Sequence, residues 1–361
     1  MTKKYYNLIL IFSLQCLLSA CQLGHLAKSA YYQSQLLIQR EPIEEVLKTN
    51  NNLSHPEQQK LKLALEVADF SWQKLGLKKN KNYRKYVQLD QPYVIYTLNA
   101  ANKDALKNYE WNYPLVGKMP YIGFFKLEDG KTAEQKMIDQ GFDTYLRGVS
   151  AYSTLGWFDD PILSSMLNYS DYDLVNTIIH ENTHATLFIK SNADFNERLA
   201  SFVGNIGAEL YYHEKEGTNS VTLQNARHET KDEKVFSQFI TEEIKKMDNW
   251  YLDFSKENSH LSTEEKNIKI NNLRELEFLK IQKRFNEEIR PLLITKKFDY
   301  FSKVKLNNAR LGLYKTYMMD LSDFEKAYQK LGSHLPKFLE FCITLEKEKN
   351  PEQALKDFIK I

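Results

Sequence analysis

The sequence predicts an α+β protein that is predominantly helical, with one small sheet before a central helix and a helical C-terminal half. Segments rich in β-branched and aromatic residues cluster between residues 93 and 152. From residue 172 onward, apolar side chains recur at helical spacing instead. The chain has 361 residues, of which 42% are hydrophobic and 13% aromatic. This is ordinary globular composition, so disordered and low-complexity classes are excluded.

The N-terminal half is expected to mix helices and strands. Residues 25–40 and 57–75 are predicted helices, and the basic run from Lys78 to Lys85 is interpreted as a solvated loop, with contact to anionic lipid as the alternative. Three segments have the composition of strands, and one short helix is expected between the last two of them. The strands are 93–98, 121–125 and 143–152, and the helix is 132–140.

The C-terminal half is expected to consist of helices. Residues 172–190 and 195–213 form two helices with a tight connection. A second pair, 233–255 and the charged helix that starts at the Ser262/Glu265 capping box, predicts a helical hairpin at about 233–288. The last helices are 306–330 and 335–360. Because there is no repeat and no Gly/Ser linker, residues 21–361 are expected to form a single domain.

Residues 1–20 are typical of a secretory signal peptide. Lys3 and Lys4 precede a short apolar run that is below the roughly 20 residues needed to span a bilayer. The run ends in Leu-Ser-Ala-Cys21, which resembles the lipobox of bacterial lipoproteins. The resemblance implies lipidation of Cys21 and a membrane anchor at the cell envelope, and Gln22 favours the outer membrane facing the periplasm. The alternative is a cleavable signal whose cysteine is incidental.

The charge balance bears on whether the protein binds nucleic acid, and the cysteine content bears on whether disulfides stabilise it. The chain carries 49 Lys+Arg against 47 Asp+Glu, and removal of Lys3 and Lys4 would leave 47 against 47. This balance argues against a nucleic-acid partner, which needs a basic surface. With a lipidated Cys21, Cys342 is the one thiol left, so no intramolecular disulfide is expected. Cys342 lies in an apolar helix and is predicted to be a packed thiol.

The central predicted helix contains the motif His-Glu-x-x-His. His180 and His184 are four residues apart, so both imidazoles lie on one face of a helix and can bind one metal ion. Glu181 is placed to take a proton from a metal-bound water as the general base. The alternative is a surface helix with two unrelated histidines.

The predicted third ligand is Glu197, at the start of the next helix. A third His six residues after His184 would be needed for the metzincin arrangement, but Lys190 stands there. Small residues on the face of Glu197 would let the two helices approach closely; they are Ala200, Ser201, Gly204 and Ala208. Glu197 could instead close a capping box with Asp194. Two His and one Glu suit one Zn²⁺ per chain, with water in the fourth position.

Three stretches are similar to a bacterial family of predicted zinc aminopeptidases. They are Gly148 to Pro161, Ile179 to His184 and Phe195 to Gly204. Members of that family are exported or lipid-anchored, and their fold and activity are inferred from the gluzincin metallopeptidases. The resemblance therefore implies a zincin-like metallopeptidase fold, with His180, His184 and Glu197 as metal ligands and Glu181 as the catalytic carboxylate.

The resemblance also implies how a peptide substrate is held. Gluzincins have an edge strand before the metal helix that can pair with an extended peptide. The matching residues here are Tyr152, Ser153, Thr154 and Leu155. Tyr317 and, as a second candidate, Tyr314 match the position of an oxyanion donor. Arg198 replaces a common Ser and is expected at the mouth of the pocket, and Arg310 is expected in an internal ion pair or, alternatively, at a substrate carboxylate.

The predicted function is zinc-dependent peptide hydrolysis, with an aminopeptidase favoured. An aminopeptidase has to bind the substrate's α-ammonium, and Asp159 and Asp160 are candidates, although a turn before Pro161 explains them equally well. An endopeptidase is the near alternative. A non-catalytic envelope lipoprotein, with a structural metal and a partner-binding hairpin, is the alternative from another class. The sequence leaves the preferred side chains, the substrate and the oligomeric state open.

Overall fold

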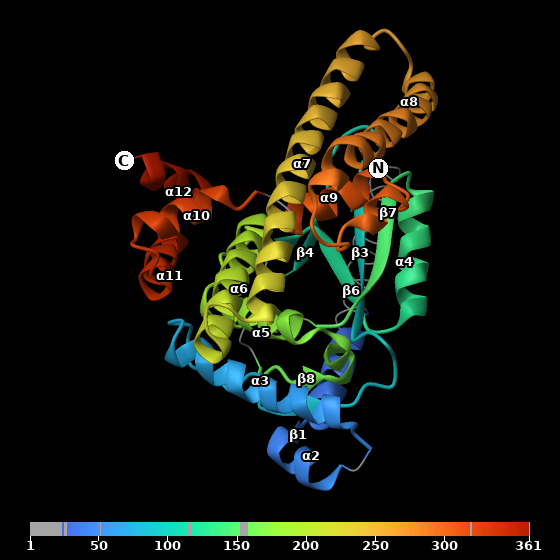
Figure 1. Cartoon of the computed structure of the whole chain (residues 1–361). Coiled ribbons are helices and arrows are strands. Elements are labelled where there is room, and N and C mark those ends of the chain that lie inside the picture. Colours follow the sequence, from blue (N-terminus) through green and yellow to red (C-terminus); the bar gives the residue numbers. More distant parts are fainter. Residues whose placement is uncertain are drawn as a thin grey trace, which may run out of the picture.

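The computed structural model describes residues 24, 27–50, 52–113, 117–151, 158–317 and 320–360. This part of the chain is α+β and mostly helical, as predicted. Figure 1 shows a central pair of helices, α5 (Asp171–Thr186) and α6 (Ala193–Glu216), with α3 (His55–Gln73) packed below them and the main sheet beside them. Within the described residues, every helix is too short or too polar to cross a membrane.

The main sheet is antiparallel and contains the three strands that the sequence predicts. Its order is β6 (Tyr121–Phe124), β3 (Ile95–Ala101) and β7 (Asp143–Val149). The helix expected here is α4 (Leu127–Asp139), which packs on the sheet. Four buried side chains join the helix to the sheet: Leu98, Ala100, Phe124 and Met137. The strand β7 therefore ends just before the segment expected to bind substrate.

Two further small sheets were not predicted, so the expectation of one sheet is wrong. The first has the order β1 (Glu41–Pro42), β2 (Lys85–Val87) and β8 (Ile162–Leu163). The second pairs β4 (Trp111–Tyr113) with β5 (Gly117–Met119). Strands of two or three residues are too short to show alternation in the sequence. β2 also starts at the last residue of the basic run, which was interpreted entirely as a loop.

The close approach of α5 and α6 depends on small residues. α5 begins after Ser170, whose Oγ accepts a hydrogen bond from the Asp173 backbone N–H at 3.0 Å. On α6, a Cβ added to Gly204 would lie 3.0 Å from Asn176 Oδ1 of α5. A Cβ on Gly207 would meet the side chains of Ile179 in α5 and of Leu75, which follows α3, at still shorter range. The backbones are therefore near enough for short side chains of the two helices to meet.

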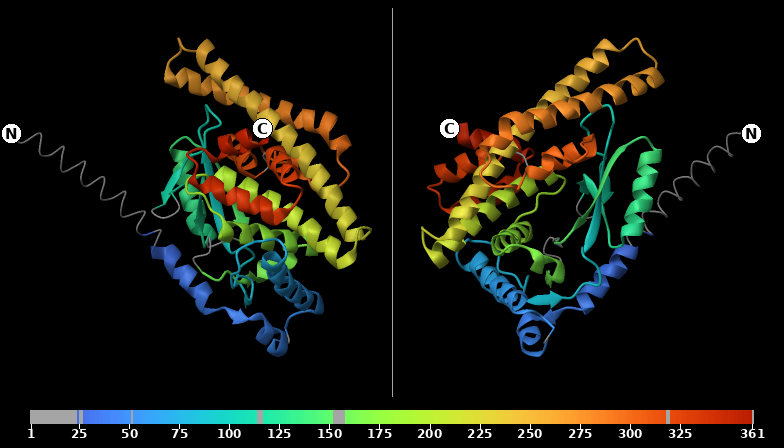
Figure 2. Two further views of the ribbon diagram at one scale, coloured as in Figure 1. Left: turned by 90° about the vertical axis from the view of Figure 1, so that its left-hand side faces the viewer. Right: turned by 45° about the vertical axis from the view of Figure 1, so that its right-hand side comes forward.

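The last helices pack against α6, as Figure 2 shows from two sides. The predicted helix 306–330 is divided into α9 (Asn308–Tyr317) and α10 (Ser322–Lys330). The predicted helix 335–360 is divided into α11 (Leu335–Thr344) and α12 (Pro351–Lys360). Cys342 of α11 is fully buried, and burial raises the pKa of its thiol. It is a packed thiol, as predicted.

The hairpin consists of α7 (Val221–Glu257) and α8 (Thr263–Arg284), and its tip projects from the molecule in Figure 1. The capping box between Ser262 and Glu265 is present at the start of α8. α7 begins at Val221 rather than near 233, because the charged residues in between obscure the helical pattern of the few buried ones. A second hydrophobic core lies at the base of the hairpin, around Phe236, Phe239, Phe285, Phe298 and Phe301. Near the N-terminus, residues 27–38 are helical, within the predicted helix 25–40, and the short helix α2 (Ile43–Thr49) follows them.

Candidate metal centre

The two histidines of the motif lie on one face of α5. His180 and His184 are one helical turn apart, and their Nε2 atoms are 3.2 Å from each other. His184 is buried and His180 is partly exposed. One face of the pair is therefore held in the protein interior, while the other can be reached by a small ligand.

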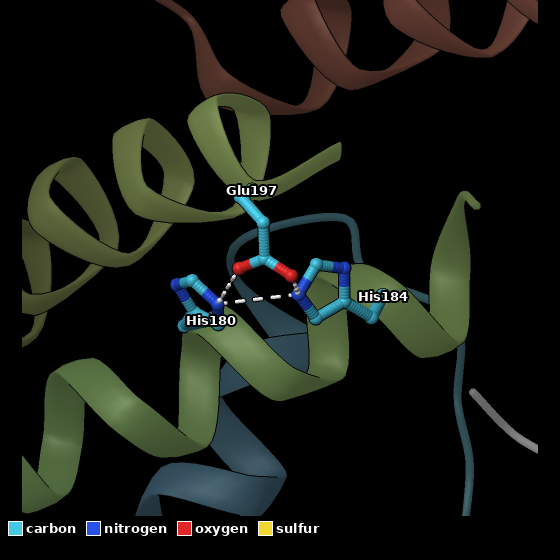
Figure 3. A group of neighbouring side chains, drawn as sticks. All are labelled: His180, His184 and Glu197. Carbon is cyan, nitrogen blue, oxygen red and sulfur yellow. Dashed lines mark hydrogen bonds and ion pairs between the residues drawn. The ribbon is translucent and has the colours of Figure 1, made fainter. Parts of the chain in front are cut away.

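Glu197 of α6 completes the cluster. Its Oε2 lies 3.4 Å from His180 Nε2, and its Oε1 lies 3.6 Å from His184 Nε2. Figure 3 shows the carboxylate between the two imidazoles, approaching from the opposite helix. Within the described residues, one nitrogen or oxygen atom from each of the three side chains lies within 4.8 Å of the others. The structure thus brings together the three side chains that the sequence selected.

The separations fit a tetrahedral metal ion. Ligand atoms about 2.0–2.2 Å from a tetrahedral ion are about 3.3–3.6 Å from one another. The two Nε2 atoms are 3.2 Å apart, and they lie 3.4 and 3.6 Å from Oε2 and Oε1 of Glu197, respectively. His184 Nδ1 is buried and has no hydrogen-bond partner among the described residues. The donor set and its spacing therefore fit a divalent metal such as zinc.

The alternative role for Glu197, closure of a capping box with Asp194, does not hold. α6 begins at Ala193 after the N-cap residue Asn192, so Asp194 lies inside the helix. Glu197 instead faces the imidazoles, and its carboxylate is buried. Burial opposes its ionisation, but the nearby imidazoles of His184 and His180 outweigh that effect and lower its pKa below the usual range.

Glu181 lies next to the cluster and differs electrostatically from Glu197. Burial of the Glu181 carboxyl raises its pKa to about 7. His180 opposes this rise, whereas the charges of Glu197 and Asp160 add to it. A carboxyl group that titrates near neutral pH can both accept and return a proton, which is what a general base and acid requires.

Asn182, between the two motif histidines, has a role that the sequence did not reveal. Its Oδ1 accepts hydrogen bonds from Asn80 Nδ2 at 3.1 Å and from Asn82 Nδ2 at 3.3 Å. Asn82 Oδ1 in turn accepts from the backbone N–H of Asp160 at 3.0 Å. These contacts hold the loop before β2 and the segment containing Asp160 against the metal helix. The partners are about a hundred residues away along the chain, so no local pattern could have indicated them.

Arg198 does not lie at the mouth of a pocket, which corrects the expectation drawn from the resemblance. It is buried and its guanidinium faces away from the cluster, toward the C-terminal helices. Nη2 donates to Asp323 Oδ2 at 2.6 Å and to the Asp320 carbonyl at 3.0 Å, and Nη1 donates to the carboxylate of Glu352. Because it follows Glu197 directly, Arg198 fixes the start of α6 to α10 and α12.

The other predicted residues fall outside the cluster or outside the described structure. Tyr314 is buried in the aromatic core of the hairpin base, and Arg310 lies over the Tyr145 ring, 4.0 Å from its centroid. Tyr317 is the last residue of α9, and its side chain is outside what the structure describes. Tyr152 to Leu155 and Cys21 also lie outside the described residues.

Comparison with known proteins identifies the family. The family model described as "Putative aminopeptidase" matches residues 24–356, which is nearly the whole chain and includes the metal cluster. No curated protein and no solved structure matches the chain. The match supports a peptidase-like activity at a coarse level. It also shows that this chain belongs to the family of that description.

Proposed function

We propose that the protein is a zinc-dependent aminopeptidase that hydrolyses peptide bonds with Glu181 as the general base. The observation that supports this most directly is the cluster of His180, His184 and Glu197, in which the two Nε2 atoms are 3.2 Å apart and each lies within 3.6 Å of one Glu197 oxygen. These separations are near those expected between the ligands of a tetrahedral zinc ion. A bound Zn²⁺ would supply a Lewis acid and a water of lowered pKa. Family membership supports the peptidase reaction.

We assign separate roles in this reaction to individual residues of the chain. Glu181 would take a proton from the attacking water and return it to the leaving nitrogen, which its neutral-range pKa permits. The hydrogen bonds to Asn182 from Asn80 and Asn82 would keep this turn of α5 in place. Tyr317 remains the proposed oxyanion donor, and Tyr152 to Leu155 the proposed substrate strand.

The exopeptidase form of the reaction needs a group that binds the substrate's α-ammonium. Asp160 is buried and close enough to Glu181 for its charge to raise the pKa of Glu181. Its backbone is bonded to Asn82 and Tyr83, and Asn82 also bonds to Asn182 of the metal helix, so the backbone of Asp160 is held beside that helix. We therefore assign the ammonium site to Asp160 rather than to Asp159.

The test of the reaction uses the zinc-loaded chain and its Glu181→Gln variant. The wild type should hold about one zinc per chain and cleave peptides. The variant should keep the zinc and lose hydrolysis by at least a hundred-fold, because general base catalysis typically contributes 10²–10⁴-fold. Equal hydrolysis by the two proteins would refute the assignment. Peptides with free and with acetylated N-termini then separate an aminopeptidase, which cleaves the free form alone, from an endopeptidase.

One observation favours the second candidate, a non-catalytic envelope lipoprotein with a structural metal. The hairpin exposes apolar side chains that a partner could cover: Leu252, Ile268, Leu276 and Leu279. In that case chelation would unfold the domain and no peptide library would be cleaved. For either candidate we propose a lipid anchor at Cys21 and a place at the cell envelope. Labelling with radioactive palmitate that is abolished by Cys21→Ser would support the anchor, and unchanged labelling would exclude it.

A further inference from the structure

A cavity of about 320 Å³ lies between α5, α6 and α7. Thr177 and Asp173 line it, and they precede His180 by three and seven residues. Residues at these spacings share one face of a helix. The α5 wall of the cavity is therefore the continuation of the face that carries the two histidines, starting one turn from His180.

The α6 wall of the cavity continues the face that carries Glu197. Ser201 and Asn205, four and eight residues after Glu197, both line the cavity. The remaining walls come from α7, from Lys297, and from α10 with the two residues before it, Asp320 and Leu321. The cavity thus starts about one helical turn from His180 on α5 and from Glu197 on α6.

The lining of the cavity combines apolar walls with an excess of carboxylates. Apolar surface is contributed by Phe202, Ile206 and Leu321. The charged groups of the lining are four carboxylates and two ammonium groups: Asp173, Glu233, Asp320, Glu325, Lys234 and Lys297. An amphipathic occupant with an apolar stem and a cationic end matches this lining.

Two of the carboxylates are compensated by lysines. Lys234 Nζ lies 2.7 Å from Glu325 Oε2, and Lys297 Nζ lies 2.7 Å from Glu233 Oε1. Lys297 also pairs with Glu229, and these carboxylates help to raise its pKa although burial opposes them. The two ammonium groups are thus engaged and do not attract an anionic ligand.

Asp173 and Asp320 have no ion pair with any lysine or arginine among the described residues. Asp173 Oδ2 accepts a hydrogen bond from Ser170 Oγ at 2.7 Å. The Asp320 carboxylate accepts from the backbone N–H and the hydroxyl of Ser322, both at 3.0 Å. Seven residues of helix separate Asp173 from His180, or about 10 Å along the axis. A long side chain on a residue next to the scissile bond can span most of that distance.

We propose that this cavity binds the lysine or arginine side chain of a residue flanking the scissile bond, with Asp173 and Asp320 receiving its charge. The apolar stem of that side chain lies along Phe202, Ile206 and Leu321. The inference rests on the proposed peptidase function and deepens it by naming a basic substrate class.

The test measures peptide binding rather than hydrolysis. The zinc-loaded Glu181→Gln protein is titrated calorimetrically with alanine-based peptides in which lysine, norleucine or glutamate occupies each position in turn. At one position the lysine peptide should bind about ten-fold more tightly than the norleucine peptide. This preference should vanish in Asp173→Asn/Asp320→Asn. Asp171→Asn is the matched control, because Asp171 is exposed on the same turn and does not line the cavity.

A second variant tests the cavity itself. Ser237→Leu on the α7 wall would partly fill the cavity without changing α5 or α6, so it should weaken lysine and norleucine peptides alike and spare the all-alanine peptide. Unfolding curves and zinc content show whether each variant is folded. Equal binding of the lysine and norleucine peptides by the parent protein overturns the proposal, even if the enzyme cleaves peptides. A lysine preference without any hydrolysis by the wild type would instead keep the binding site and overturn the proposed function.

Discussion

Two pairs of antiparallel helices, α5 with α6 and α7 with α8, are built in opposite ways. In the first pair, glycines on α6 bring the backbones together, so that His184 and Glu197 meet directly across the interface. In the second pair, large aromatic side chains at the base of the hairpin fill the space between the helices, among them Phe239 and Phe285. The apolar contacts continue toward the tip through Tyr251, Phe254 and Ile270.

The two pairs also differ in how they are attached to the rest of the protein. α5 and α6 lie in the largest apolar core, with α3 and the C-terminal helices around them. The hairpin is fixed to the main sheet through a buried polar contact. Arg274 of α8 donates to both oxygens of Asp143 in β7, at 2.6 and 3.0 Å, and the backbone N–H of Asn308 donates to the same carboxylate at 2.9 Å.

This difference shows where the geometry of the centre comes from. When two backbones are close, the positions of short side chains are set by the backbones, so small structural changes alter the cluster. When large side chains fill the space between two helices, those side chains can adjust to a substitution on the helix surface without moving the backbones. We therefore expect changes in the first pair to alter metal binding and changes in the hairpin to alter stability alone.

The largest effect should come from the buried contact of the hairpin. Asp143→Ala leaves the buried Arg274 guanidinium without its carboxylate, which should lower the free energy of unfolding by about 3–5 kcal/mol. Urea unfolding measures this loss, and zinc affinity should change little in the folded variant. The double variant Asp143→Leu/Arg274→Met should recover most of the stability, because it removes both charges. A double variant no more stable than Asp143→Ala would show that the ion pair is not the reason for the loss.

Metal removal should cause the next largest loss of stability. This loss should be seen in α5 and α6. With zinc at a hundred-fold above its Kd, binding adds about 2.7 kcal/mol to the free energy of unfolding. Chelation removes this contribution, and amide exchange should become faster in α5 and α6 while α8 is unchanged. Glu197→Ala should abolish the difference between zinc-loaded and chelated protein. Equal stability with and without zinc in the wild type would contradict the proposed site.

A single methyl group on α6 should have a smaller but more specific effect. The Cβ of Gly207→Ala would lie 2.8 Å from Leu75 Cδ1 and 2.9 Å from Ile179 Cγ2 of α5. Since the branched Ile179 side chain cannot move without its helix, overpacking should cost about 1–3 kcal/mol and weaken zinc binding.

A helical glycine away from the centre is the control for this variant. Gly130→Ala in α4 meets only flexible ends of side chains, the nearest being Leu146 Cδ1 at 3.0 Å. Here the better helix propensity of alanine should keep stability equal or raise it. If Gly207→Ala and Gly130→Ala have the same zinc affinity and the same stability, the close approach of α5 and α6 does not position the ligands.

The sequence could predict features that depend on local patterns, but not features that depend on contacts between distant segments. The ligands were found because helical spacing places His180 and His184 together and small residues mark the face of Glu197. The partners of Arg198, the hydrogen bonds to Asn182 and the cavity walls from α7 come from distant segments, so no local pattern carries them. The short strands of the two minor sheets and the start of α7 were missed because too few residues there show periodicity. Long, strongly patterned elements were therefore predicted, and tertiary contacts were not.

The smallest effect should come from removing one helix cap in each region. Ser170→Ala removes the side-chain acceptor at the start of α5, which should lower the free energy of unfolding by about 1 kcal/mol. Ser262→Ala removes the equivalent cap at the exposed tip of the hairpin, where the first turn of α8 can open without disturbing the core. Amide exchange should show local opening at the start of α8, while the unfolding midpoint stays the same. An equal loss of global stability in both variants would mean that the hairpin tip unfolds together with the central helices, and the distinction between the two pairs would fail.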